Sequence, residues 1–137
     1  MAYLLDTNVI SEPMRAKPNM KIVRWLDELE SAHVSVLTFG ELRKGIASAK
    51  DDIRRNRLEA WLEGDLTARF AQRTHKVDSR IADRWGRLVA SVARPLPVID
   101  SLLAATALTH DLILATRNVR DFADIVGLRL YDPWSDA

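Results

Sequence analysis

Acidic side chains occur at four separate points of the chain, each close to a short apolar run. Asp6 follows YLL, Asp100 follows LPVI, and Asp121 comes shortly after LILAT. Glu41 lies a few residues beyond VSVL. Residues that follow the strands of a parallel sheet gather at one edge of that sheet. We therefore expect these carboxylates to approach one another in the folded protein.

Carboxylates held within several ångströms of each other repel, and some must take up protons unless a cation is present. A hard divalent cation relieves this repulsion. Mg²⁺ prefers oxygen ligands, keeps several of its waters, and needs only one or two direct carboxylates. Two such ions can stabilise the attacking and leaving oxygens when a phosphodiester is cleaved. The acids together thus indicate a magnesium site suited to phosphodiester chemistry.

Each acid also has a structural explanation near the start of a helix. These explanations are an Asx-turn at Asp6, a capping box of Thr38 and Glu41, an N-cap at Asp100, and an Asx cap at Asn118 with an early helical acid at Asp121. Each is sufficient when one acid is considered alone. None of them explains why the acids should converge.

The elements that must position these acids alternate between strands and helices. Short strands are predicted at 3–5, 34–37, 112–116 and 128–131. Helices are predicted at 19–29, 38–49, 51–68, 78–92 and 101–109, with a helical turn at 118–122. Pro95 and Pro97 interrupt the chain between the last two long helices. This alternation favours an α/β fold with a mainly parallel sheet.

Length and composition exclude several classes of protein. A chain of 137 residues suits one domain, and we expect a single domain over 1–137. The absence of cysteine excludes disulfides, thiolate zinc sites and cysteine nucleophiles, and fits a reducing cytoplasm. No apolar segment approaches the length of a membrane span, and the N-terminal residues do not read as a secretion signal. We therefore expect a cytoplasmic protein without membrane contact.

The formal net charge of +1 conceals an uneven distribution. Residues 54–94 carry ten basic and five acidic side chains, whereas the segments on either side are slightly acidic. Within this section, Arg80, Arg84 and Arg87 form one stripe of a predicted helix. The section could lie along a polyanion, or it could be a solvated helix face.

The histidines and tryptophans give weaker signals. His33, His75 and His110 lack the HExxH spacing and have no cysteine companions, so we expect separate surface or capping roles for them. Four tryptophans occupy apolar helical positions or lie near the C-terminus, namely Trp25, Trp61, Trp85 and Trp134. For these we expect packing in the core or in a dimer interface rather than base stacking.

Four segments of the chain, in order, resemble the PIN-domain nucleases, and in particular the VapC-type toxins of prokaryotic toxin–antitoxin pairs. The segments are LLDTNVI, TFGELRKG, DSLLAATA and LATRNVRDF. The longer opening LLDTNVISEPMR and the ending YDPW are most similar to the FitB-like subgroup. A single DTN would be a weak signal, but four motifs in order over 137 residues are specific.

This resemblance implies both a fold and an activity. The implied fold is a PIN-like, Rossmann-like three-layer α/β structure with a mainly parallel central sheet flanked by helices. The implied activity is metal-dependent endoribonuclease cleavage of RNA by the toxin of a type II pair. A cognate antitoxin would block the site, the toxin would form a homodimer, and operator DNA would be contacted only through the antitoxin.

The resemblance also assigns roles when it is carried over motif by motif. Asp6 and Asp100 are the implied ligands of Mg²⁺ or Mn²⁺, and Glu41 and Asp121 complete the implied catalytic acids. The implied supporting residues are Thr7, Asn8, Thr116 and Asn118. Many relatives carry an acid at the position of Asn118, so Asn118 and Asp121 are alternatives for the fourth site residue. Basic residues near the acid motifs could steer an RNA backbone, namely Arg15, Lys17 and Arg117.

Two rival interpretations remain. An aspartyl-phosphate phosphatase or receiver domain would also place Asp6 after the first strand. However, Asn8 stands where the phosphatase needs a second acid, and Asp6-Thr7 supplies only one member of the acidic pair of a receiver. The other rival is a non-catalytic PIN-like scaffold that binds an antitoxin. The sequence contains neither a P-loop nor a G-x-S-x-G hydrolase motif.

Overall fold

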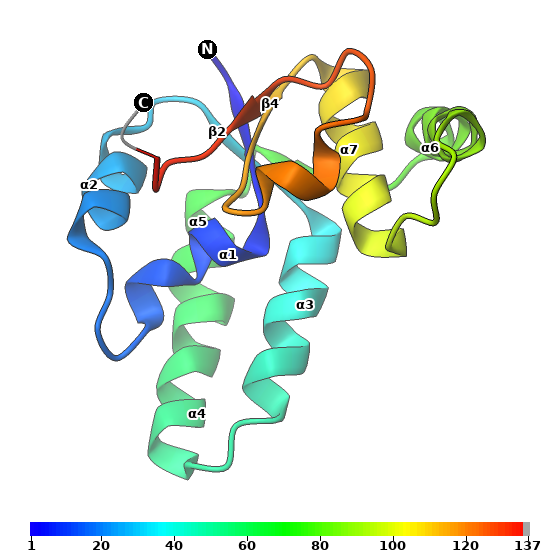
Figure 1. The fold of residues 1–137 in the computed structure, drawn as a ribbon. Helices are drawn as coiled ribbons and strands as arrows, with labels where there is room; N and C mark the ends of the chain where they lie inside the picture. Colours follow the sequence, from blue (N-terminus) through cyan, green and yellow to red (C-terminus); the bar gives the residue numbers. More distant parts are fainter. Residues whose placement is uncertain (136–137) are drawn as a thin grey trace.

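A five-stranded parallel sheet forms the centre of the protein in the computed structural model, which describes residues 1–135 (Figure 1). The strands are β1 (Tyr3–Leu5), β2 (Ala32–Ser35), β3 (Thr74–His75), β4 (Ile113–Ala115) and β5 (Leu130–Tyr131). They lie in the order β3-β2-β1-β4-β5, and every neighbouring pair is parallel. The predicted α/β fold with a mainly parallel sheet is confirmed.

Helices cover both faces of this sheet. In chain order they are α1 (Thr7–Ile10), η1 (Glu12–Met14), α2 (Met20–Glu28), α3 (Val36–Ala47), α4 (Asp52–Ala60), the π-helical η2 (Trp61–Leu66), α5 (Thr67–Arg69), α6 (Ser79–Ser91), α7 (Val98–His110) and η3 (Val119–Phe122). None of the helices within residues 1–135 is long and apolar enough to cross a membrane.

The hydrophobic core has two parts because successive strand residues face opposite sides of the sheet. Leu5 is fully buried among residues of α1 to α4 and η2, whereas its neighbour Leu4 is fully buried among residues of α6, α7 and η3. Three of the four tryptophans pack against the first part, namely Trp25, Trp61 and Trp134. The result is the three-layer arrangement that the resemblance implied.

The order of the strands creates a switch point at the centre of the sheet. From β1 the chain continues to β2 on one side, and β4 lies on the other side of β1. In such sheets, ligands bind beyond the carboxyl ends of the two strands that flank the switch. Here those ends are joined by a hydrogen bond of 2.9 Å from the backbone N–H of Asp6 to the carbonyl of Ala115.

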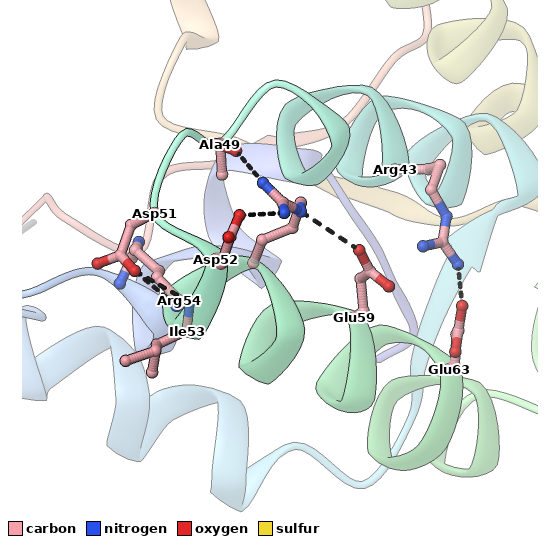
Figure 2. A network of polar contacts seen from close by, with 9 residues as sticks. Arg43, Ala49, Asp51, Asp52, Ile53, Arg54, Glu59 and Glu63 are labelled. Carbon is pink, nitrogen blue, oxygen red and sulfur yellow. Dashed lines mark hydrogen bonds and ion pairs between the residues drawn. The ribbon is translucent and has the colours of Figure 1, made fainter.

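Helices α3 and α4 form an arm that extends away from the sheet (Figure 1). Polar contacts brace this arm: Arg43 Nη2 and Glu63 Oε1 lie 2.6 Å apart, and Arg55 donates to the carbonyl of Ala49 at 2.8 Å. Asp51 caps α4 by accepting hydrogen bonds from the backbone N–H groups of Ile53 and Arg54 (Figure 2). Arg43 and Arg55 on this arm are therefore paired with carboxylates.

The boundary between β2 and α3 differs from the prediction. The strand covers Ala32–Ser35 rather than 34–37, because Ser35 already caps α3 by accepting from Leu37 N–H at 3.1 Å. The predicted capping box of Thr38 and Glu41 is therefore wrong, since Thr38 is the third residue of the helix. The Thr38 hydroxyl is buried and has no hydrogen-bond partner within residues 1–135.

Two other predictions need correction. The run LPVI before Asp100 is not a strand: Pro97 occupies the N-cap position of α7, and Asp100 lies in the first helical turn rather than capping it. Proline suits a helix start because it lacks the N–H that would be unsatisfied there. The predicted helix 51–68 is divided into α4, η2 and α5. The two-residue strand β3 was not predicted because it has no alternating apolar pattern.

Candidate active site

Asp6 stands directly after β1 and caps the short helix α1. Only 6% of the residue is exposed. Its Oδ1 accepts a hydrogen bond from Thr7 N–H at 2.7 Å, and its Oδ2 accepts one from Thr116 Oγ1 at 2.8 Å. Burial raises the pKa of the Asp6 carboxyl, these two hydrogen bonds oppose the rise, and the nearby charge of Glu41 adds to it. Both oxygens are thus fixed in direction at the edge of the sheet.

Glu41 comes from α3 and joins the same edge. Its Oε1 accepts a hydrogen bond of 2.6 Å from Thr7 Oγ1, across 34 positions of sequence. The residue after Asp6 therefore links the first strand to the helix that follows the second strand. This contact, rather than a capping box, accounts for the position of the Glu41 carboxylate.

Asp100 reaches the edge from the first turn of α7 and is half-buried. Burial is the main cause that raises the pKa of its carboxyl, followed by the negative charges of Asp6, Glu41 and Asp121. Coulomb repulsion weakens with distance and is screened by solvent. The pKa of Asp100 responds to the charges of all three other carboxylates, so the four groups lie near one another. Together, Asp6, Glu41, Asp100 and Asp121 are called the acidic centre.

The end of β4 completes the wall of this acidic centre. Thr116 is buried, and its Oγ1 accepts hydrogen bonds from Asn118 N–H at 3.1 Å and from Asn8 Nδ2 at 3.5 Å while donating to Asp6. Asn8 Oδ1 accepts from the backbone N–H of Arg117 at 3.3 Å. These contacts hold α1 against the segment between β4 and η3.

Asn118 and Asp121 lie on the open side of the centre. Asp121 is exposed and is the third residue of η3, as the sequence predicted for an early helical acid. Asn118 occupies the N-cap position of η3, but its side chain makes no capping hydrogen bond, so the predicted Asx cap is wrong. The Asn118 side chain is exposed beside the acids.

The three basic residues considered for RNA have different surroundings. Arg15 pairs with the almost fully buried Glu12 at 3.1 Å. Arg117 lies over the ring of Trp134, with its guanidinium carbon 5.1 Å from the ring centroid. Lys17 is exposed in the segment before α2. Arg15 and Arg117 therefore have intramolecular contacts as well as exposed charge.

The donor set of the acidic centre fits a hard divalent ion, because all four groups offer carboxylate oxygens and two of them have raised pKa values. Within residues 1–135, no three acidic or histidine side chains are already arranged around one metal position. An ion here would therefore be held by one or two direct carboxylates with water between it and the others. That is the coordination Mg²⁺ prefers.

The three histidines form a cluster, and the prediction of separate surface or capping roles is wrong. His33 Nδ1 and His75 Nε2 share a hydrogen bond of 2.9 Å, and the rings of His75 and His110 lie 4.2 Å apart between centroids. Burial lowers the pKa of His75 to about 4, with the charges of His110 and His33 adding to the effect. No spacing pattern in the sequence indicates this cluster, because β2, β3 and α7 contribute one histidine each.

Two grooves meet at Glu41, one on each side of α3. The larger, with a volume of about 580 Å³, runs along α3 towards Ile99 and contains Lys44 as its basic residue. The smaller, of about 290 Å³, lies between η1, α3 and α4 and contains Arg15 and Arg54. Glu41 therefore borders two grooves that differ in their basic residues.

Comparison with known proteins agrees with this architecture. The chain matches the PIN domain over residues 3–128. It is 36% identical to "Toxin FitB" of Neisseria gonorrhoeae over 140 residues, covering 97% of this chain and 99% of that protein. It is 34% identical to "VapC ribonuclease Y4jK" of Sinorhizobium fredii over 139 residues, covering 98% of this chain and 99% of that one.

A solved structure shares the fold along the whole domain. It is that of FitAB bound to an IR36 DNA fragment, with a TM-score of 0.87, 33% identity, and coverage of 97% of this chain and 96% of that chain. The fold and the acids at the switch point define a PIN-like α/β domain. The chain belongs to the PIN-domain family, and its relatives place it among the FitB and VapC proteins.

Proposed function

We propose that this protein is the toxin of a type II toxin–antitoxin pair and acts, as a single domain, as a Mg²⁺- or Mn²⁺-dependent endoribonuclease. The observation that carries this proposal is the pair of hydrogen bonds at the switch point, from Thr116 to Asp6 and from Thr7 to Glu41. They hold two carboxylates from distant parts of the chain at one edge of the sheet. The relatives, which are named as a toxin and as a VapC ribonuclease, support it.

In this proposal Asp6 and Asp100 hold the ion directly. When bound, Mg²⁺ or Mn²⁺ supplies positive charge that stabilises the reacting phosphate. Glu41 and Asp121 orient the attacking water and accept its proton. The water oxygen forms a bond to phosphorus, the bond from phosphorus to the leaving nucleotide oxygen breaks, and that oxygen takes a proton from solvent water. Thr116 and the Thr7 backbone keep the Asp6 carboxylate in place during the reaction.

The same acidic centre suits inhibition by a partner. A guanidinium binds carboxylates bidentately and keeps its charge at any physiological pH. We propose that a cognate antitoxin places an arginine against these acids, and that operator DNA is contacted only through the antitoxin. We also propose a homodimer and a cytoplasmic location, where the RNA substrate is found. The solved FitAB–DNA complex is consistent with such an assembly.

A cleavage assay tests this function. Purified protein is incubated with structured RNAs in EDTA and in millimolar Mn²⁺, alongside the variant Asp100→Asn. The matched control is Asp65→Asn, which removes an exposed acid from η2, outside the acidic centre. We expect cleavage by the wild type and by the control in Mn²⁺ only, and none by Asp100→Asn. Cleavage that persists in EDTA, or that survives Asp100→Asn, would contradict the proposal.

Experiments on the same purified protein distinguish the nuclease from the non-catalytic scaffold. A wild-type protein that binds its antitoxin but never cleaves RNA in Mn²⁺ would favour the scaffold. Inhibition is tested with an antitoxin peptide and its Arg→Ala variant. Equal inhibition by both peptides would count against the arginine mode while leaving the nuclease itself intact.

A further inference from the structure

The smaller groove is lined by one member of the acidic centre and by two basic residues. The hydrogen-bonded pair Thr7 and Glu41 contributes to its lining, as do Arg15 and Arg54. Its volume of about 290 Å³ lies near the lower end of small-ligand pockets, which span about 300–1,000 Å³. This size suits one nucleotide unit.

Arg54 also lines this groove, although it was not among the basic residues predicted to lie near the active site. It comes from the first turns of α4, and its Nη2 donates a hydrogen bond of 2.9 Å to the carbonyl of Met14, 40 positions away. This contact fixes the guanidinium at the groove. Within residues 1–135 Arg54 pairs with no carboxylate, whereas its neighbour Arg55 is paired with Asp52 and Glu59. The positive charge of Arg54 is therefore not neutralised by a salt bridge.

Arg15, the residue after Met14, adds a second guanidinium to the lining of the groove. The side chain of Arg15 is 59% exposed, although it also pairs with Glu12. Glu12 accepts in addition from the backbone N–H of Asn19 at 2.9 Å, so its charge is shared between two partners. Two guanidiniums close to a carboxylate site can bind the phosphates that flank a cleaved bond.

The rest of the lining of the groove is mainly apolar. It includes side chains from α3, α4 and the start of η2, namely Leu42, Ile46, Leu58 and Trp61. Leu42, Ile46 and Leu58 are nearly buried, so the partly buried Trp61 offers the main surface on which a base of any identity can stack. The larger groove also has apolar lining but contains Lys44 instead of the two arginines. The charge difference favours RNA in the smaller groove.

We propose that the groove between η1, α3 and α4 binds the nucleotide next to the cleaved phosphate, with Arg54 and Arg15 contacting the RNA backbone and the apolar lining contacting the base. This inference rests on the proposed endoribonuclease function. It makes Arg54 a substrate-positioning residue and the groove a contributor to the choice of cleavage site.

The test compares Arg54→Gln with a matched control on the same helix. Arg57→Gln removes the same charge from an exposed position of α4 that is not part of the groove. The substrate is a short fluorescein-labelled single-stranded RNA of mixed sequence in Mn²⁺. We expect Arg54→Gln to raise KM about tenfold with kcat nearly unchanged, because a charged hydrogen bond to phosphate is lost. The slope of log KM against log salt should fall by about 1, and Arg57→Gln should change neither quantity.

A purely structural role for Arg54 predicts a different result. Loss of its bond to Met14 would lower the melting temperature of Arg54→Gln while leaving the salt slope unchanged, and Arg54→Lys would fail to restore KM. We instead expect Arg54→Lys to recover much of the wild-type KM, because it keeps the charge. An unchanged salt slope, or an Arg54→Gln variant that binds RNA normally but resists the antitoxin, would overturn the inference.

Removal of single bases from the RNA tests the apolar part of the groove. Abasic nucleotides are placed in turn on each side of the cleavage site. One abasic position should weaken binding about fivefold or more, as expected when a base loses a packing surface. No effect at any position would overturn the base contact. A wild-type protein that neither binds nor cleaves the RNA would instead remove the proposed function, and this inference with it.

Discussion

The acidic centre and the histidine cluster both gather titratable side chains from distant parts of the chain, but they resolve their repulsion differently. In the acidic centre, burial and neighbouring charges raise the pKa values of Asp6 and Asp100. In the histidine cluster, burial and neighbouring charges lower the pKa values of His33 and His75. Histidines avoid mutual charge repulsion at neutral pH by staying uncharged. Carboxylates keep most of their charge near neutrality, and we propose that a cation balances it.

The hydrogen bonds of the two regions show the same contrast. Asp6 and Glu41 accept from threonine hydroxyls, which stabilise the charged carboxylate. His33 and His75 bond to each other, which requires at least one ring nitrogen without a proton. The first region is therefore built to keep charge, and the second to avoid it. This difference supports the proposal that the acidic centre is the reactive one.

The largest expected effect comes from neutralising the buried acid. Asp6→Asn should reduce RNA cleavage by more than about 100-fold, since even residues that only support a metal ligand cost about 10–100-fold. Its melting temperature in EDTA should not fall, because the substitution removes a charge that burial and Glu41 disfavour. Cleavage rates and thermal melting with EDTA check both parts. A large loss of melting temperature without metal would show that Asp6 is mainly a structural cap.

A smaller effect distinguishes the two candidates for the fourth site residue. Asp121→Asn should lower cleavage about tenfold and raise the Mn²⁺ concentration required, because the charge of Asp121 reaches Asp100. Asn118→Asp should retain activity, because it adds a carboxylate beside the others. Cleavage rates measured over a series of Mn²⁺ concentrations distinguish these two candidates. The assignment is reversed if Asp121→Asn cleaves at the wild-type rate while Asn118→Ala is inactive.

The smallest effect concerns the histidine cluster and stability rather than cleavage. The folded protein holds the pKa of His75 at about 4, below its ordinary value of 6.5, so the unfolded chain binds more protons in that window. Stability should therefore fall as the pH is lowered from about 6.5 towards about 4. The groups that act on this cluster include Arg73 and Asp78 as well as His33 and His110.

Urea unfolding at pH 7 and pH 5 measures this effect. His75→Gln keeps a polar side chain at the position but cannot titrate, so the difference in unfolding free energy between the two pH values should shrink. Asn56→Gln, a change at an exposed position of α4, serves as the control. An equal pH dependence in His75→Gln and the wild type would mean that the cluster does not affect stability through protonation.

The sequence predicted the acidic centre better than the histidine cluster for a physical reason. Asp6 follows a buried strand, and the chain order of the motifs placed the other acids near strand ends or helix starts. His75 belongs to a two-residue strand with no periodic pattern, and His110 ends a helix on another layer. Contacts between such elements depend on tertiary packing, which local patterns do not encode.

Within the acidic centre, the prediction of location was better than the prediction of local structure. Asp100 was expected after a strand, but it reaches the edge from the first turn of α7 because Pro97 starts that helix early. Glu41 was matched to a capping box, but it bonds to Thr7 instead. Arg54 was grouped with a general basic section, since only the packing of α4 against η1 brings it to the groove.

The most direct test of the account is a calorimetric titration of Mn²⁺ into the wild-type protein and into Asp100→Asn, with melting temperatures recorded at each metal concentration. The acidic centre should bind Mn²⁺ saturably, and the stabilisation should follow about RT ln(1 + [L]/Kd). Asp100→Asn should melt no earlier than the wild type in EDTA but should lose most of the metal-dependent gain. A wild-type melting curve unchanged by millimolar Mn²⁺, with no heat of binding, would contradict the claim that these four acids form one metal centre.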